Sequence, residues 1–322
     1  MKTIGVFTSG GDSPGMNACI RAVVRCAIFN KKKVVGIMRG YDGMIQNNIV
    51  ELNSRSVSNI IHRGGTILKT ARSKQFMTSA GMKTAYANLK KNKIDALIAI
   101  GGDGTFRGAV EFNAKYDIPF IGIPGTIDND LMGTDFTLGF DTAVNTAVEA
   151  IDKIRDTAAS HNRIFFVEIM GRDSGYLALW AGVAGGSEDI LLPESKTSVT
   201  DLVKKLEDGV KKGKESSIVV VAEGDEGGGA LKIAKEVSKK FNYDTRVSIL
   251  GHIQRGGTPT VFDRILGTKF GVFAVEKLLK GETDKMTGIQ QNQLVLVDLQ
   301  KAVKHHAPLD KHLLRYSKFL SI

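Results

Sequence analysis

Short apolar runs alternate with amphipathic stretches along almost the whole chain, and this rhythm restricts the possible folds more than any other feature. The strand-like runs are Thr3–Thr8, Val34–Met38, Ala96–Ile100, Phe120–Ile123, Ile164–Ile169, Ile190–Leu192, Ile218–Ala222 and Val247–Leu250. Helical patterns lie between them, the clearest at Asp141–Ala159, where Val144, Val148 and Ile151 share one face. We therefore expect an α/β fold of doubly wound, three-layer α/β/α (Rossmann-like) domains with mostly parallel sheets.

The chain has 322 residues, which is long for a single hydrophobic core, so two domains are expected. A boundary near residues 139–141 fits, because Gly139 directly precedes the long helical pattern. No apolar run reaches the roughly 18 residues that a membrane span needs. Met1–Gly11 carries neither a basic leader nor a cleavage site. These features predict a cytoplasmic protein without a membrane partner.

The cysteines and the net charge bear on two further classes of protein. Cys19 and Cys26 lie about 10 Å apart in one predicted helix, whereas the Cα atoms of a disulfide are roughly 4.4–6.8 Å apart. The net charge of +10 is compatible with a nucleic-acid partner, but solvated lysine faces account for it equally well. No aromatic-interleaved basic stripe and no RNA or DNA motif is present. We expect no nucleic-acid partner, and some arginines placed for phosphorylated ligands.

Glycine-rich or charged loops follow the strand-like runs at their carboxyl ends, where folds of this type bind ligands. These loops are Gly10–Asp12, Gly101–Thr105, Pro124–Asp130, Met170–Arg172, Glu223–Gly224 and His252–Arg255. In the first two, a Gly-Gly pair between a strand and a helix lets backbone N–H groups approach a phosphate. Asp103 in the second is suited to hold Mg²⁺ beside that phosphate. Two tight turns of an ordinary α/β fold are the alternative.

The standard nucleotide-binding motifs are absent. The third glycine of a dinucleotide fingerprint would be position 107, which is Arg107. No Walker-type sequence exists, because Gly213-Lys214 is followed by Glu215. The protein-kinase signature residues are missing as well. A phosphate-binding site in this chain must be of another type.

The segment Thr126–Asp130 carries two carboxylates, Asp128 and Asp130, directly after a strand that ends in Pro-Gly. Transfer of a phosphoryl group to an alcohol needs positioning, neutralisation of charge and a group that accepts the hydroxyl proton. Asp128 suits the last of these roles. The alternative is that the aspartates cap a turn and the start of a helix.

Taken together, these motifs make the chain resemble the bacterial ATP-dependent 6-phosphofructokinases of the phosphofructokinase A family. The matching strings occur in order over about residues 2–295, namely Thr8–Asn17, Gly101–Thr105, Pro124–Asp130, Met170–Arg172 and Gly251–Gly257. The resemblance implies transfer of the ATP γ-phosphoryl group to the 1-hydroxyl of fructose 6-phosphate, a committed step of glycolysis. It also implies an ATP-binding domain (1–139 plus about 252–303) and a fructose 6-phosphate-binding domain (140–251 plus about 304–322).

Site residues implied by the family, position by position, divide between the two ligands. The implied ATP ligands are Gly11, Arg72, Ser73, Gly102, Asp103, Gly104, Thr105 and Gly108, with Asp103 on Mg²⁺. Asp128 matches the general base, and the other implied catalytic residues are Arg72, Thr126, Asp130 and Arg172. The implied sugar-phosphate contacts are Thr126, Asp128, Met170, Gly171, Arg172, Glu223, His252 and Arg255. For Arg72 alone, a solvated surface arginine is the ordinary interpretation.

Arg163 and Arg246 begin the strands that end before Met170 and His252. A strand of seven residues spans roughly 20 Å at ~3.3 Å per residue, so neither arginine easily reaches the carboxyl edge of its own sheet. In the family, the matching positions bind the sugar 6-phosphate of a neighbouring subunit, which implies a homo-oligomer, in this family a homotetramer. Surface arginines that flank strands are the alternative.

The phosphoryl donor can be argued from two glycines. Relatives that use pyrophosphate carry Asp after Gly-Gly-Asp and Lys in the Pro-x-Thr-Ile-Asp loop, where this chain has Gly104 and Gly125. Positions without a side chain leave room for an α-phosphate and a ribose. ATP is therefore the expected donor.

Arg21 and Arg25 share one helix face, and Met16–Asn30 contains no acid to pair with them. The family places a site here for ADP, GDP or phosphoenolpyruvate as effector, which also uses Arg155, Glu188, Lys212 and Lys214. The chain departs from some relatives at Ser54, Asn59, Glu215 and Ser216. Because basic groups are lost, anion binding should be weaker, and a plain solvated face stays open as the alternative.

Three other functions fit parts of the sequence. Gly-Gly-Asp-Gly-Thr also occurs in NAD kinases and lipid kinases, but these do not explain the Thr126–Asp130 loop together with the GHIQRGG string. A non-enzymatic sugar-phosphate sensor would need neither Asp128 nor Asp103. A dehydrogenase would need the absent dinucleotide fingerprint.

Overall fold

A computed structural model describes residues 1–304 and 307–320 and divides the chain into two compact units. Unit 1 comprises residues 1–127, 131–142 and 255–307, and unit 2 comprises residues 128–130, 143–254 and 308–322. The ends of the predicted domains include residues 305–306 and 321–322, which lie outside the described residues. Which unit binds which ligand stays a prediction.

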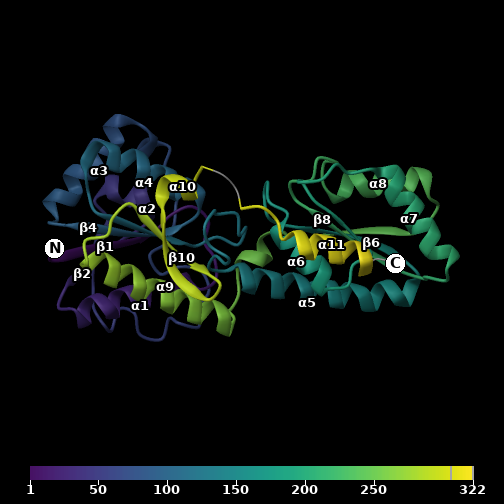
Figure 1. The fold of residues 1–322 in the computed structure, drawn as a ribbon, viewed down its shortest axis with the longest axis horizontal. Coiled ribbons are helices and arrows are strands. Elements are labelled where there is room, and N and C mark those ends of the chain that lie inside the picture. Colours follow the sequence, from purple (N-terminus) through teal and green to yellow (C-terminus); the bar gives the residue numbers. More distant parts are fainter. Residues whose placement is uncertain (305–306, 321–322) are drawn as a thin grey trace. The chain divides into compact units, whose positions relative to one another are not determined.

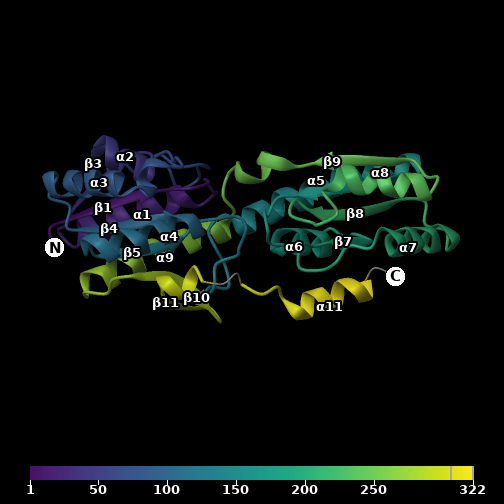
Figure 2. The ribbon, with the colours of Figure 1, turned by 90° about the horizontal axis from the view of Figure 1, so that it is seen from above.

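The strands of unit 1 are β1 (Thr3–Thr8), β2 (Lys33–Ile37), β3 (Ile49–Leu52), β4 (Ala96–Gly101), β5 (Phe120–Pro124), β10 (Lys285–Gln290) and β11 (Gln293–Asp298). They form one sheet in the order β11-β10-β5-β4-β1-β2-β3, which Figure 2 shows from β3 to β11. Neighbouring strands are parallel except that the edge strands β3 and β11 run antiparallel to β2 and β10. The order reverses between β1 and β4, so the loops after these strands flank the position where such sheets bind ligands.

Helices cover both faces of this sheet (Figure 1). On one face lie α1 (Met16–Phe29) and α9 (Val261–Leu279), and on the other lie α2 (Gly40–Gln46), α3 (Ser79–Lys91), α4 (Asp103–Tyr116) and α10 (Leu299–Ala302). Successive side chains of a strand point to opposite faces. Val6 therefore packs in the layer of α1 and α9, and its neighbour Phe7 packs in the layer of α2, α3 and α4.

The contact between α1 and α9 is close because α9 presents glycines to α1. A methyl group at Gly271 would lie 2.7 Å from Cβ of Ala22, and one at Gly267 would lie 2.9 Å from the carbonyl oxygen of Gly15. Both distances are shorter than ordinary van der Waals contact. Since α1 begins at the end of the first glycine-rich segment, this packing holds the helix into which that segment leads.

Unit 2 contains the strands β7 (Asp189–Leu191), β8 (Ser217–Ala222), β6 (Ile164–Ile169) and β9 (Thr245–Ile249), all parallel and in this order. On one face, α7 (Val199–Lys211) and α8 (Ala230–Lys240) bury Leu206 and Val237 against Phe166 and Val219. On the other lie α5 (Phe140–His161), whose first residues belong to unit 1, and α6 (Tyr176–Ala184) (Figure 1). α11 (Lys311–Leu320) contacts α6.

The predicted fold class is confirmed by these two layered, mostly parallel sheets. Each predicted strand is present with ends within two residues of the prediction, and the long predicted helix corresponds to α5. The strands β3, β10 and β11 have no counterpart among the predictions. The hairpin between β10 and β11 turns at Gln291 and Asn292, which have φ angles of 47° and 63°, and thus lacks the glycine that usually marks such a turn.

Two smaller expectations can be compared with the structure. Within residues 1–304 and 307–320, no helix is both long and apolar enough to cross a bilayer. Cys19 and Cys26 are both free thiols on α1, as their helical spacing requires. Burial raises the pKa of the Cys19 thiol far above its ordinary value, so this side chain is a neutral, apolar part of the core.

Candidate active site

The two glycine turns of unit 1 lie side by side because the strands that lead into them are neighbours. β1 pairs in parallel with β4, and each turn leaves the carboxyl end of its strand. The Ser9 N–H donates to the Ile100 carbonyl (3.1 Å). The Thr105 hydroxyl then donates to the Ser9 carbonyl (3.0 Å). A side chain of the second turn therefore fixes the backbone that leads into the first.

Glycine serves different purposes within these turns. Gly10 has a φ of 85°, a left-handed conformation that other residues rarely adopt. At Gly11 a Cβ would lie 2.6 Å from Nη1 of Arg255, and this guanidinium donates to the Asp12 carbonyl (3.2 Å). Arg255, expected at the sugar phosphate, is thus in contact with the first glycine turn. At Gly104 no atom of residues 1–304 and 307–320 lies within 4 Å of the position that a Cβ would occupy.

The second turn leads directly into α4, and a buried tyrosine supports the start of this helix. The Tyr41 hydroxyl donates to the Thr105 carbonyl (2.6 Å), and burial raises its pKa far above the ordinary value, so it remains a donor. The Tyr41 ring also backs Gly108, where a Cβ would lie 3.1 Å from the ring. Asp103 Oδ1 accepts from Arg107 Nε (2.9 Å) one helical turn further on. Side chains of unit 1 therefore contact and fix the residues of α4 that are predicted to bind ATP.

Arg72 lies on a long irregular segment that follows β3, and a threonine ties this segment to the first glycine turn. The Thr70 hydroxyl donates to the Gly10 carbonyl (2.8 Å), two residues before the exposed Arg72. Ser73, a predicted nucleotide ligand, accepts the Phe76 N–H at its hydroxyl (3.3 Å), where the 3-10 helix η1 (Gln75–Met77) begins. The segment that carries Arg72 is thus anchored through Thr70, and the side chain of Arg72 itself stays exposed to solvent.

Thr126 follows β5 and begins the segment Thr126–Asp130, of which residues 126 and 127 belong to unit 1. Its carbonyl accepts from the Thr137 hydroxyl (2.6 Å), and a Cβ at Gly102 would lie 3.4 Å from its own Cβ. Thr126 therefore borders the second glycine turn, as predicted for one carboxyl edge. At Gly125, by contrast, a Cβ would lie 2.9 Å from Cγ2 of Ile100, so core packing explains that glycine.

Asp128 belongs to unit 2, where it faces an arginine across a long ion pair. Its Oδ2 lies 3.9 Å from Nε of Arg172, and the two side chains are 4% and 52% exposed. Arg172 has a φ of 52°, a conformation that is uncommon for residues other than glycine and is often found at functional sites. The Ser174 hydroxyl donates to the Asp128 carbonyl (3.2 Å). The ion pair is long, and the half-exposed guanidinium of Arg172 therefore remains accessible to a ligand.

The loops after β6, β8 and β9 bring together the other predicted sugar-phosphate residues. These strands are neighbours in the order β8-β6-β9, so their loops leave the same edge. Glu223 Oε2 accepts the N–H groups of Gly171 (3.4 Å) and Arg172 (3.2 Å). At Gly224 a Cβ would lie 1.8 Å from the Arg172 carbonyl oxygen, so only glycine fits there. Met170 and the exposed His252 start the two remaining loops.

Arg163 and Arg246 lie at the opposite, amino edge of the same sheet, as the strand arithmetic requires. Arg246 pairs with Phe165 in the register of β6 and β9, and Arg163 directly precedes β6. Both arginines bind Asp244: Arg163 Nε lies 2.7 Å from Oδ2, and Arg246 Nη1 bonds to Oδ1. The hydrogen bond from Arg163 and the charges of both arginines hold the pKa of Asp244 below its ordinary value. Two arginines on one carboxylate leave a net positive charge.

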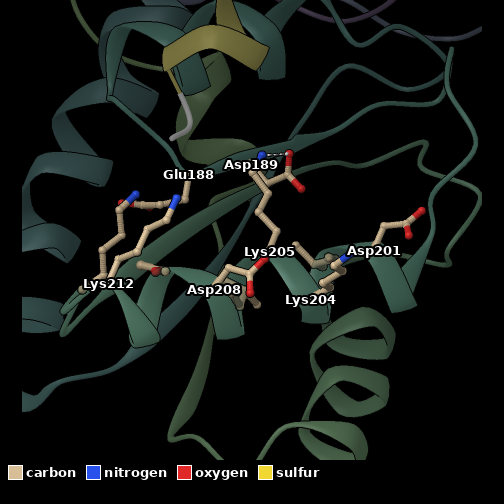
Figure 3. A pocket seen from close by; sticks show the side chains of 12 residues that line it. Glu188, Asp189, Asp201, Lys204, Lys205, Asp208 and Lys212 are labelled. Carbon is tan, nitrogen blue, oxygen red and sulfur yellow. Dashed lines mark hydrogen bonds and ion pairs between the residues drawn. The ribbon is translucent and has the colours of Figure 1, made fainter.

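Part of the predicted effector set lines a cavity of about 270 Å³ between α7 and the amino ends of β7 and β8. Glu188, Lys212 and Lys214 belong to its lining, and Figure 3 shows Glu188 close to Lys212. Lys205 reaches toward Asp189 in the same view, with Nζ 3.0 Å from Oδ1. The lining is therefore of mixed charge.

The predicted effector arginines do not line this cavity. Arg155 Nη2 donates to the carbonyls of Gly185 (2.6 Å) and Gly186 (2.8 Å), and its Nη1 lies 3.9 Å from Oε1 of Glu188. The exposed Arg25 and the half-buried Arg21 are on α1 of unit 1. The predicted set is thus divided between the units, and its role as an effector site stays a prediction.

Four residues that fix the predicted ligand-binding residues in place were not predicted from the sequence. They are Tyr41, Thr70, Asp244 and Gln254. Most of them bond to backbone atoms of distant segments, for which side-chain type and spacing give no signal. Asp244 is the exception, because an acid two residues before Arg246 is visible in the sequence.

Known proteins supply an independent comparison. The sequence matches the family described as Phosphofructokinase over residues 3–278. It is 53% identical over 322 residues to the ATP-dependent 6-phosphofructokinase 1 of Thermus thermophilus, with 100% of both chains covered. It is 52% identical over 323 residues to the ATP-dependent 6-phosphofructokinase 2 of Bacteroides thetaiotaomicron, with 100% of this chain and 99% of the relative covered.

A solved structure agrees with these relatives. The structure of phosphofructokinase from Saccharomyces cerevisiae superimposes with a TM-score of 0.89 and 36% identity over 94% of this chain. This chain spans 45% of the yeast chain. With a family match over most of its length and full-length relatives above half identity, the chain belongs to the phosphofructokinase family.

Proposed function

We propose that the protein is an ATP-dependent 6-phosphofructokinase. It transfers the γ-phosphoryl group of ATP to the 1-hydroxyl of fructose 6-phosphate and releases fructose 1,6-bisphosphate and ADP, the committed step of glycolysis, in the cytoplasm. The observation that carries this proposal is the 53% identity to an ATP-dependent relative over the full length of both chains. The glycine turns and the buried Asp128 support it independently.

Unit 1 is the nucleotide side of this proposal. Backbone N–H groups of the two glycine turns lie at the switch point between β1 and β4, where phosphates bind in such sheets. The open space at Gly104 leaves room for a nucleotide phosphate or ribose, which supports ATP as donor. Gly125 does not add to this argument, because its neighbours fill the space of a side chain. The solvated Arg72 offsets negative charge on the transferring group.

Mg²⁺ is proposed to accompany ATP. In the described part of the chain, no three His, Cys, Asp or Glu side chains are grouped to hold a metal ion. This suits Mg²⁺, which keeps several waters and takes one or two carboxylates together with phosphate oxygens. Asp103, with a side chain 24% exposed, is the residue that would hold the ion. The bound ion would neutralise part of the phosphate charge.

Unit 2 is the sugar-phosphate side. Asp128 accepts the proton of the attacking hydroxyl, and Arg172 beside it stabilises the charge that develops in the transition state. Asp130 orders the loop, and Thr126 lies at its start. Met170, Gly171, Glu223 and His252 are the proposed contacts of the sugar phosphate in unit 2, and Arg255, which belongs to unit 1, is proposed as a further contact. Asp128 is 3% exposed, and this burial limits its exchange with bulk water.

The assembly and its control complete the proposal. Arg163 and Arg246, with their net positive charge at the amino edge, bind the 6-phosphate of a neighbouring subunit, so the enzyme works as a homo-oligomer, as a homotetramer in this family. An effector of the ADP, GDP or phosphoenolpyruvate kind would bind beside Glu188, Lys212 and Lys214. The commitment of Arg155 to two carbonyls supports weak rather than strong anion binding there.

The replacement Asp128→Asn tests the function and its base together. ADP release is followed in a coupled assay with fructose 6-phosphate, tagatose 6-phosphate, NAD or buffer as acceptor. We expect fructose 6-phosphate to be the preferred acceptor of the native protein. In the variant, kcat should fall by at least ~100-fold while sugar-phosphate affinity is largely kept, because only proton transfer is lost. Asp152→Asn, on the exposed surface of α5, is the matched control. An unchanged kcat in Asp128→Asn contradicts the role of Asp128.

A further inference from the structure

Gln254 is a fully buried glutamine that directly follows two exposed residues. It lies in the 3-10 helix η2 (Gly251–Arg255), which follows β9, and it is 0% exposed. His252 and Ile253, directly before it, are both exposed. A polar side chain that is wholly buried among exposed neighbours needs a hydrogen-bond partner to offset its lost hydration. The partner of Gln254 therefore indicates what the residue does.

The partner of Gln254 is a backbone group at the end of β6. The ladder between β6 and β9 closes with the Leu250 N–H, which donates to the Glu168 carbonyl (3.0 Å). The chain then turns away at Gly251, with a φ of 53°, so β9 supplies no carbonyl for the next N–H of the partner strand. That group, the Met170 N–H, donates instead to Gln254 Oε1 (3.1 Å). The glutamine side chain continues the ladder where the backbone leaves it.

This bond also determines the orientation of the amide. An N–H donor at Met170 requires the oxygen of the Gln254 amide on that side. The other atom, Nε2, is buried and has no acceptor within residues 1–304 and 307–320. No second bond from the described chain holds the side chain in place. Met170 is thus the group against which Gln254 is aligned.

Met170 begins the loop after β6, and the first three N–H groups of this loop each bond to a side chain from the loop after β8 or β9. Gly171 and Arg172 donate their N–H groups to Glu223 after β8, and Arg172 reaches Asp128 at 3.9 Å. Gln254, after β9, holds the first residue of this loop. If the first bond is lost, the loop can rotate about the end of β6, and the alignment of Arg172 is lost with it.

We propose that Gln254 is a positioning residue for the sugar-phosphate site, which acts through the Met170 N–H. It couples the loop after β9, which contains His252, to the loop after β6, which contains Arg172. The inference rests on the proposed function and adds a residue for which that function assigns no role. It predicts an effect on the sugar phosphate that is not shared by the nucleotide.

Two replacements separate the acceptor from the shape of the side chain. Gln254→Leu leaves the buried Met170 N–H without an acceptor, whereas Gln254→Glu keeps an acceptor oxygen at the same distance along the chain. We expect the KM for fructose 6-phosphate to rise at least about tenfold in Gln254→Leu, with the KM for ATP within about twofold of the native value. Gln254→Glu should restore the sugar-phosphate KM to within about threefold. Gln300→Leu, at an exposed site on α10, is the control.

The outcomes separate this inference from the proposed function. A native protein that does not phosphorylate fructose 6-phosphate refutes the proposed function. An active native protein whose Gln254→Leu variant keeps its sugar-phosphate KM, or changes both KM values in equal proportion, overturns the positioning role. So does a Gln254→Glu variant that is as poor as Gln254→Leu. If the variants do not fold, hydrogen–deuterium exchange of the native protein decides: a Met170 amide that exchanges as slowly as the strand amides of β6 supports the bond, and exchange at the rate of an exposed loop refutes it.

Discussion

Asp263 is a fully buried carboxylate in unit 1 whose ionisation should make the stability of the fold depend on pH. It accepts the Gly139 N–H (2.8 Å), the Thr142 N–H (2.9 Å) and the Thr142 hydroxyl (2.5 Å), where α5 begins. These bonds favour the charged form, but burial disfavours it and is the larger effect, assisted by the charge of Asp141. The pKa of Asp263 is therefore raised from 3.8 to about 6.

The magnitude follows from this difference in pKa. A rise of about two pH units corresponds to about 3 kcal/mol, at ~1.36 kcal/mol for each unit. Because the pKa is higher in the folded state, the folded protein binds more protons than the unfolded chain between pH 3.8 and about 6. The contribution of Asp263 to the free energy of unfolding is fully present below pH 3.8 and is lost as the pH rises through about 6.

The replacement Asp263→Asn isolates this group, because asparagine does not titrate. Urea unfolding followed by far-UV circular dichroism gives the free energy of unfolding of both proteins across the pH range. We expect the native value minus the variant value to fall by about 2 kcal/mol as the pH is raised from about 4 to about 6.5. A difference that stays constant or grows with pH would show that burial does not outweigh the three hydrogen bonds, and that the pKa of Asp263 is not raised in the folded protein.

Two further predictions concern the active site. Gly104→Ala adds a methyl group to open space at the start of α4, so the free energy of unfolding, measured by thermal unfolding, should stay equal or rise by up to ~1 kcal/mol. The KM for ATP, measured from initial rates, should rise at least about threefold because phosphates approach this position. An unchanged KM for ATP contradicts the nucleotide role of Gly104. A second experiment mixes Asp128→Asn subunits with Arg163→Ala subunits, each of which should be nearly inactive alone. The mixture should recover about a quarter of the native rate, because random assembly makes about one shared site in four intact. The absence of any recovery argues against sites shared between subunits.

The parts of the fold that were predictable are those in which one chain segment carries its own pattern. β1 is buried at every position from Thr3 to Thr8, as expected for a central parallel strand, and its apolar run defines it without knowledge of its neighbours. β3 (Ile49–Leu52) is an edge strand with only Leu52 buried. Its backbone is held in a strand by its hydrogen bonds to β2, whereas its own sequence lacks a run of buried apolar residues. No local pattern could therefore have identified it.

The site divides in the same way. The residues proposed to meet the ligands, such as Asp103 and Asp128, belong to short motifs, and their side-chain chemistry is visible in the sequence. Residues that hold them bond to main-chain atoms far away: Thr70 to Gly10 across 60 positions, and Gln254 to Met170 across 84. Every residue has a backbone carbonyl, and every residue except proline has an N–H, so the sequence does not show which main-chain group is the partner. Only the folded chain identifies them.

Two glycines of the same series of motifs can therefore be required for different physical reasons. This difference bears on which molecule donates the phosphoryl group. At Gly104 the space beside the backbone is open, so a side chain there would meet a ligand before it met the protein. At Gly125 a side chain would first meet Ile100, at 2.9 Å, and Met16, at 3.1 Å. A larger residue at 104 can thus change what binds without disturbing the core, whereas one at 125 requires the layer of α1 to move as well. Of the two glycines, only Gly104 therefore supports ATP as the donor, whereas Gly125 is required by the close packing of β5 and α1.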